Sequence, residues 1–147
     1  MSNLSRNFSF KEMWVSADHP EIIKAGIEQY PPCGLPDWTI PRLSLLCYQV
    51  LQPIRDKFNK PLHLLSVYRN DILNTAVGGS KTSDHMQAIA ADFYIKGVEM
   101  KDVFMWIQKT LCFRQLIFYP ANGFIHVSMN TPTVRPYKTQ SWVKGQE

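Results

Sequence analysis

Apolar residues follow helical spacing most clearly in two parts of the chain, 39–58 and 99–110. The apolar side of the first expected helix is made of Leu43, Leu46, Cys47, Val50, Leu51 and Ile54. Pro41 fits its first turn, where the missing N–H costs nothing. Pro53 lies inside the pattern and is expected to kink this helix or to end its first part. One face of the second expected helix consists of Val103, Trp106 and Ile107.

Shorter helices are expected in two other places. Residues 8–28 have the pattern of one or two short helices, and Ser9 and Glu12 have the spacing of a capping box. The proline-rich segment 30–36 predicts a loop, because its residues break regular structure. Residues 69–76 predict a further short helix.

Compact apolar runs predict a small sheet in the second half of the chain. The expected strands are 62–67, 88–95, 115–119 and 123–129. The last two runs are separated by Pro120, Ala121 and Asn122, which are turn residues, so a hairpin is expected there. Helices early in the chain and a small sheet later predict an α+β fold.

Composition and charge narrow the classes of function. The chain has 147 residues, of which 45% are hydrophobic and 19% charged, as in an ordinary globular domain. Its net charge of +4 suits anionic partners such as nucleic acid or cell-wall polymer. No run rich in Lys and Arg is present, so we expect no nucleic-acid partner. No apolar stretch reaches the roughly 18 residues of a membrane span.

The N-terminus and the cysteines bear on the compartment. The first ten residues lack the apolar run of a signal peptide, so we expect synthesis in the cytoplasm without such a peptide. Cys33, Cys47 and Cys112 are widely spaced and odd in number. We expect reduced, mostly buried thiols rather than a disulfide framework.

Two histidines and an aspartate form a candidate metal site. His85 and Asp92 are seven residues apart, and His126 lies on a later expected strand. A catalytic zinc ion takes three protein ligands of these types and keeps a position open for water. A carboxylate inside an apolar strand must be paired, hydrogen-bonded or bound to a metal, because an unpaired buried charge is costly.

Other interpretations of the same residues stay open on spacing alone. Asp92 could form a salt bridge at a strand edge, and His126 could be a hydrogen-bonded core histidine. His63, in another apolar strand, could replace one ligand, whereas His19 is expected at the surface.

The pattern Ser-x-His-x-x-x-x-Ala-x-Asp-Phe at 83–93 resembles the zinc signature of D-Ala-D-Ala carboxypeptidases and L-Ala-D-Glu endopeptidases. These peptidoglycan peptidases share their architecture with the Hedgehog signalling domain. Similarity extends to NFSFKEM near the start, VLQPIRDKFNKPLHLLSVYRN, LNTAVGGSKTSDHMQAIAADF and FRQLIFYPANGFIHVS. Within this group the chain resembles the small phage and prophage members.

The resemblance implies a Hedgehog/DD-peptidase-like α+β fold, with a small antiparallel sheet packed with helices. It implies a single domain over 1–147, with its core at about 7–130 and a C-terminal tail at 131–147. The tail contains two prolines and few apolar anchors.

The resemblance also implies roles for individual residues. His85, Asp92 and His126 match the ligands of one zinc ion. Arg69 matches an arginine that binds a substrate carboxylate or carbonyl, for which a guanidinium fork is well shaped. Ser83 matches a serine that orients the loop or binds substrate. Gln115 matches a residue that is more often structural, and the salt-bridge or helix-start role of Arg69 remains an alternative.

The chain departs at two points from the family that it resembles. The usual glycine three residues after the first ligand is Ala88, a mild change if its backbone is ordinary. The usual catalytic Glu or Asp near the last ligand is not evident. No carboxylate lies between Asp102 and Glu147, and the expected strand position holds Phe118 and Tyr119. Tyr119 could polarise a carbonyl, or it could be a hairpin-core aromatic.

Three hypotheses follow. The first is a zinc metallopeptidase, a carboxypeptidase or endopeptidase of endolysin type. It would be a monomer that acts on peptidoglycan stem peptides at the cell wall, after release or as a virion component. The second is a catalytically weak or inactive zinc-containing module that binds cell wall or belongs to a virion. The third is a domain that binds no metal.

Overall fold

A sheet with the strand order β3-β4-β6-β5-β7 carries the fold. The computed structural model describes residues 3–146. The strands are β3 (His63–Ser66), β4 (Ala90–Tyr94), β5 (Gln115–Tyr119), β6 (Phe124–Ser128) and β7 (Gln140–Val143). Neighbouring strands are antiparallel except β5 and β7, which are parallel. The mixed α+β class and the mainly antiparallel small sheet are confirmed.

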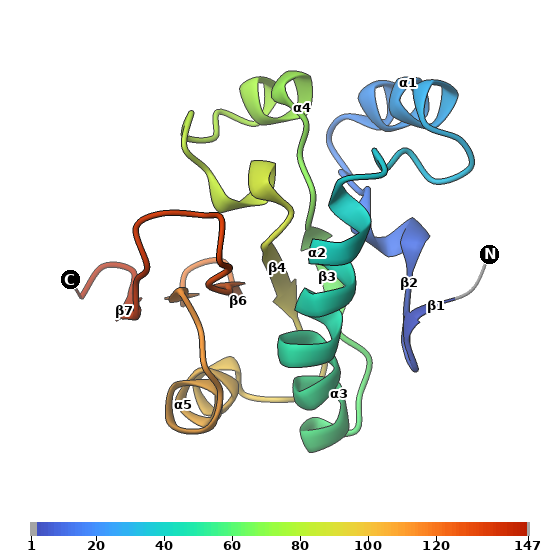
Figure 1. Cartoon of the computed structure of the whole chain (residues 1–147). Helices are drawn as coiled ribbons and strands as arrows, with labels where there is room; N and C mark the ends of the chain where they lie inside the picture. The colour runs from blue at the N-terminus through green and yellow to red at the C-terminus, as the bar shows by residue number, and fades with distance from the viewer. Residues whose placement is uncertain (1–2, 147) are drawn as a thin grey trace.

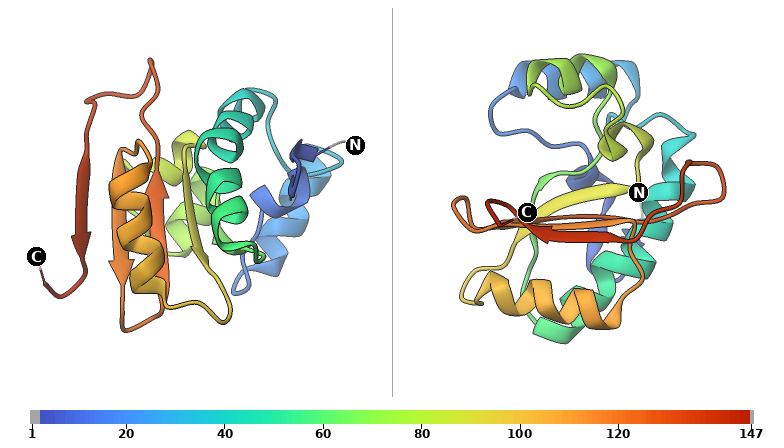
Figure 2. Two further views of the ribbon diagram at one scale, coloured as in Figure 1. Left: turned by 90° about the horizontal axis from the view of Figure 1, so that it is seen from below. Right: turned by 90° about the vertical axis from the view of Figure 1, so that its left-hand side faces the viewer.

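Helical elements cover both faces of this sheet. Helix α5 (Met100–Thr110) lies on one face, whereas α4 (Asp71–Ala76) and the 3-10 turn η3 (Asp84–Gln87) lie on the other (Figures 1 and 2). Helix α1 (Pro20–Gln29) lies beside α4 (Figure 1). The side of the sheet opposite α5 therefore carries the loop that contains His85.

The alternation of side chains along the strands separates core from site. In β4 Phe93 is fully buried in the core, and in β6 Ile125 and Val127 are buried there as well. Because successive residues of a strand point to opposite faces, Asp92 and His126 point away from this core. The apolar pattern that builds the core thus presents the polar residues on the other face.

The long expected helix at 39–58 is present as three consecutive segments. They are α2 (Thr39–Leu46), a π-helical turn η2 (Cys47–Leu51) and α3 (Gln52–Phe58). The N–H of Gln52 donates to the carbonyl of Cys47, five residues back. The ring of Pro53 would crowd the carbonyl four residues before it, and the wider π turn provides room for the ring.

The N-terminal region contains short helical elements, as expected over 8–28. The 3-10 turn η1 (Phe10–Met13) precedes α1, and the carboxylate of Glu12 accepts hydrogen bonds from the N–H and hydroxyl of Ser9. A two-stranded pair, β1 (Asn3–Ser5) with β2 (Phe8–Ser9), precedes it. Strands this short have too few residues to show an apolar period.

The segment after β6 returns to the sheet as β7. In its register with β5, Gln115 is opposite Gln140. The N–H of Gln140 donates to the carbonyl of Arg114, and Val143 packs on the core. The residues expected to form a tail thus add an edge strand, held largely by backbone hydrogen bonds. Within residues 3–146 no helix is long and apolar enough to cross a membrane.

Candidate metal centre

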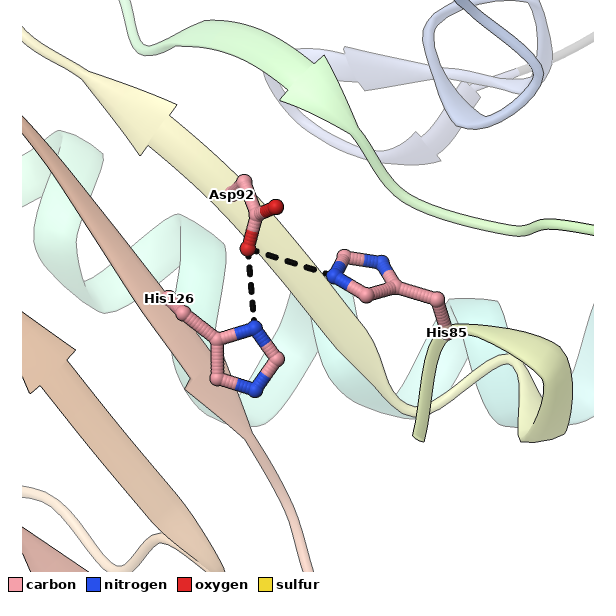
Figure 3. A group of neighbouring side chains, drawn as sticks. All are labelled: His85, Asp92 and His126. Carbon is pink, nitrogen blue, oxygen red and sulfur yellow. Dashed lines mark hydrogen bonds and ion pairs between the residues drawn. The ribbon is translucent and has the colours of Figure 1, made fainter. Parts of the chain in front are cut away.

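The β4–β6 register and the η3 turn bring three candidate ligands together (Figure 3). Asp92 on β4 is the register partner of His126 on β6, so their side chains lie next to each other on one face of the sheet. His85 approaches from η3, which lies over that face. The ligand atoms of these three residues all lie within 4.8 Å of one another.

Both histidines direct a nitrogen at the same carboxylate oxygen. Oδ1 of Asp92 lies 3.2 Å from Nε2 of His85 and 2.8 Å from Nδ1 of His126. In a tetrahedral zinc site with bonds of 2.0–2.2 Å, neighbouring ligand atoms are about 3.4 Å apart. The observed separations are hydrogen-bond lengths somewhat shorter than this spacing, and the three side chains lie close enough together to hold one ion.

The second nitrogen of His85 indicates what lies between these atoms. Nδ1 of His85 is 2.7 Å from the backbone carbonyl of Val67, which can only accept a hydrogen bond. Nδ1 must therefore carry a proton, and in a neutral imidazole Nε2 then presents a lone pair. A lone pair directed at a carboxylate requires a proton or a cation between them. Such a hydrogen bond to the remote nitrogen is also usual for a metal-binding histidine.

The electrostatics of Asp92 favour an anion. Burial opposes its ionisation, but the charge of His85 and hydrogen bonds from His126 and His85 outweigh burial and hold the pKa of Asp92 well below its usual value. Asp92 is thus an anionic carboxylate between two imidazoles, and such a donor set is suited to zinc.

Arg69 lies at the edge of this cluster and is fixed by neutral partners. Its Nε donates to the hydroxyl of Ser66 at 3.0 Å and its Nη1 to Oδ1 of Asn74 at 3.3 Å. Its Nη2 is 3.7 Å from Oδ2 of Asp92, a loose ion pair. Burial lowers the pKa of Arg69 and nearby Asp92 opposes this, yet an arginine stays protonated in proteins.

Gly79 permits the position of Arg69. A Cβ at this glycine would lie 2.2 Å from Oδ1 of Asn74 and 2.8 Å from Nη1 of Arg69. Both distances are far below van der Waals contact. Gly79, one of two adjacent glycines in the sequence, is therefore required by the close packing around the guanidinium.

A buried ion pair between Asp84 and Arg114 stabilises the loop that contains His85. Nε of Arg114 donates to both carboxylate oxygens of Asp84, at 3.2 and 3.1 Å, and Ser128 donates to Oδ2 at 2.9 Å. Asp84 and Arg114 are 8% and 4% exposed. No sequence pattern links these two residues, which are 30 positions apart. The one signal is an acidic residue directly before a candidate ligand histidine.

Two residues of the 83–93 motif shape the backbone around His85. The hydroxyl of Ser83 accepts a hydrogen bond from the N–H of His85 at 3.2 Å. Ala88 ends the η3 turn with φ of 58° and ψ of 37°, in the left-handed region. The exchange of the usual glycine for Ala88 is therefore not mild, because this conformation costs a residue with a Cβ about 1–2 kcal/mol.

The candidate ligands line a cleft of about 460 Å³. Arg69, Tyr119 and Lys138 also line it, and among residues 3–146 its acidic residues are Asp84 and Asp92. Asp84 is bound to Arg114, and Asp92 faces the histidines. The described residues of the cleft thus provide no additional carboxylate. Nε2 of His126 is buried and has no hydrogen-bond partner among residues 3–146.

The structure shows which of Phe118 and Tyr119 faces the cleft. Tyr119 lines the cleft and stacks on Phe124, with ring centroids 4.5 Å apart. Phe118 points to the other face and packs near Phe104 of α5. Tyr119 therefore occupies the cleft-facing position at which a catalytic carboxylate was expected.

The remaining histidines and the cysteines lie outside the cluster. His63 stacks on Tyr94 with ring centroids 4.7 Å apart. His19, directly before α1, lies beside Glu21. All three cysteines are free thiols, buried at Cys33 and Cys47 but exposed at Cys112. Burial, with a smaller effect of Glu12, raises the pKa of Cys47 to about 12.

A family model described as Peptidase M15 matches residues 7–128, which include all the candidate ligands and Arg69. No curated protein matches the chain.

Proposed function

The chain belongs to the M15 peptidase family, and we propose that it is a zinc-dependent peptidase acting on the stem peptides of peptidoglycan. The convergence of His85, Asp92 and His126 on one point, next to the half-buried Arg69, carries this proposal. The similarity to small phage and prophage peptidases supports an endolysin-type role at the cell wall, after release or within a virion.

In this proposal His85, Asp92 and His126 hold one zinc ion. The chemistry that zinc supplies when bound is polarisation of the scissile carbonyl and activation of water. Val67 fixes the His85 ring through its carbonyl, and Arg69 binds a substrate carboxylate through the donors that face the cleft. Ser83 keeps the loop in place and lies in the same cleft, where its hydroxyl can also contact substrate.

Proton transfer is the step for which the described cleft residues offer the fewest suitable groups. A general acid or base typically contributes about 10²–10⁴-fold to the rate. Tyr119 is the cleft-facing group at the expected position, and its hydroxyl can donate a hydrogen bond to a carbonyl oxygen. A phenol holds its proton at neutral pH, so we expect slow turnover compared with enzymes that carry a carboxylate there.

The proposal is tested by incubating the zinc-loaded protein with purified peptidoglycan and with soluble stem peptides. Mass spectrometry identifies released D-alanine for a carboxypeptidase and new internal amines for an endopeptidase. His126→Ala should abolish product formation, whereas His63→Ala, a matched change outside the cluster, should not. Absence of any product from the unmodified protein with zinc bound would refute the peptidase proposal.

A second candidate function is a zinc-containing module that binds cell wall without cleaving it. The absence of a further carboxylate among the described cleft residues favours this alternative. Sedimentation with purified cell walls separates the two candidates. Binding without hydrolysis supports the module, whereas hydrolysis that is lost in His126→Ala excludes it.

A further inference from the structure

Lys138 is a second cation in the cleft that holds the candidate ligands. It is half-buried and lines the same cavity as Arg69, His85 and His126. The ion pairs among residues 3–146 do not include Lys138, whereas Arg69 faces Asp92. A half-buried lysine that has no carboxylate partner among the described residues is available to an anionic ligand.

The backbone of Lys138 is held on both sides by Asn130. The side-chain amide of Asn130 donates to the carbonyl of Lys138 at 2.6 Å, and its oxygen accepts from the N–H of Lys138 at 3.1 Å. Two residues earlier, Arg114 donates to the carbonyl of Pro136. Two residues later, β7 begins its pairing with β5. Lys138 therefore starts from a fixed backbone position, although its segment lies beyond the family match at 7–128.

Sheet order places Arg69 and Lys138 at opposite edges of the sheet. Arg69 follows β3 at one edge, and Lys138 precedes β7 at the other. The candidate ligands Asp92 and His126 belong to β4 and β6, between these edges. Figure 1 shows the segment before β7 arching over the same side of the sheet as η3. Strands are about 4.8 Å apart, so the start of β7 lies roughly 12 Å from the ligand strands.

We propose that Lys138 binds a carboxylate of an acidic peptide substrate, a few residues from the scissile bond and on the side away from Arg69. This inference rests on the proposed peptidase function, because it assumes that a peptide crosses the ligand cluster. An extended peptide rises about 3.3 Å per residue, so the distance corresponds to roughly three to four residues. Arg69 and Lys138 together would then select peptides with acidic groups on both sides of the bond.

The test compares two synthetic stem peptides that differ at one position. One carries a free carboxylate about three to four residues from the candidate scissile bond, and the other carries the amide. Dissociation constants are measured by calorimetry with zinc-loaded protein, and kcat and KM are measured on the same pair. The variants are Lys138→Met, Lys138→Arg and Lys101→Met. Lys101 is exposed on α5, on the far face of the sheet, and controls for the loss of one charge.

For Lys138→Met we expect the acidic peptide to bind roughly five- to twentyfold more weakly, as for loss of a charge-assisted hydrogen bond. Binding of the amide should change little, kcat should be nearly unaffected, and Lys138→Arg should restore the preference. The proposal is overturned if Lys138→Met weakens both peptides equally or neither, or if the unmodified protein binds neither. A protein that binds the acidic peptide through Lys138 but never cleaves it refutes only the peptidase proposal.

Discussion

Asp92 and His126 are register partners on β4 and β6, and Oδ1 of the carboxylate lies 2.8 Å from Nδ1 of the imidazole. A shift of one residue in this register would move one of the two side chains to the core face. The apolar pattern on the core face, with Phe93 opposite Ile125, prevents that shift. The packing of the core therefore determines the geometry of the candidate metal centre.

The lowered pKa of Asp92 predicts how the metal-free protein responds to acid. A carboxyl whose pKa is lower in the folded state stabilises the fold above its unfolded pKa, about 3.9, and this contribution is lost as pH falls towards the folded value. Urea unfolding in the presence of a chelator should therefore show stability falling below about pH 4. Asp92→Asn should have a shallower slope in that range. Parallel curves for the two proteins would contradict the assignment.

Ala88→Gly should stabilise the protein. The left-handed backbone at this position strains an alanine but not a glycine, and the expected gain is about 1 kcal/mol. Chemical denaturation measures the free energy of unfolding. Ala90→Gly, in strand β4, is the matched control and should destabilise, because its backbone is extended. A loss of stability in both variants would show that the turn does not need a glycine.

Arg114→Met should destabilise the protein by about 3–5 kcal/mol, because it leaves the buried carboxylate of Asp84 without its cation. The loop before His85 should loosen with it, so zinc should bind more weakly in a competition titration with a chelator. The double variant Asp84→Leu/Arg114→Met removes both charges. It should be less destabilised than the sum of the single changes, and strict additivity would argue against the ion pair.

Gly79→Ala should weaken substrate binding through Arg69. The added methyl group would overlap Asn74 and the guanidinium, so both side chains must move. We expect KM to rise roughly tenfold, as for loss of a charge-assisted hydrogen bond, with zinc content unchanged. Gly78→Ala is the control, because a Cβ there meets nothing within 4 Å and only its φ of 71° is strained. An equal rise in KM for both variants would point to loop strain instead.

Tyr119→Glu should accelerate hydrolysis. It places a carboxylate at the cleft-facing strand position, where a general base is expected, and such a group typically contributes about 10²–10⁴-fold. The change is measured as kcat on a stem peptide with zinc-loaded protein. Tyr119→Gln has similar shape without the charge and should not accelerate the reaction. A rate unchanged by Tyr119→Glu would mean that the tyrosine position is not where the proton is transferred.

Much of the fold and of the candidate metal centre could be predicted from the sequence. Apolar spacing located the helices near 39–58 and 99–110 and the strands of the sheet other than β7, since these elements bury one regular face. The ligand set could be named because His85 and Asp92 lie in one short motif and His126 in a recognisable strand. Local pattern and motif were sufficient for these features.

Other features depended on contacts between distant residues. The pairing of Asp84 with Arg114, separated by 30 positions, has no sequence period. Strand β7 is short, and its parallel pairing with β5 depends on backbone hydrogen bonds that any side chain allows. The left-handed conformation of Ala88 follows from the way η3 joins β4, which composition does not reveal.

The sequence by itself determined the elements, the family resemblance and the residues able to bind a metal. The tertiary structure decided that Tyr119 rather than Phe118 faces the cleft. It also decided that Lys138, between β6 and β7, lines the same cleft. The physical reason is that side-chain alternation fixes faces only relative to neighbouring residues. Which face becomes core, and which distant segment covers the other, is set when the whole sheet packs.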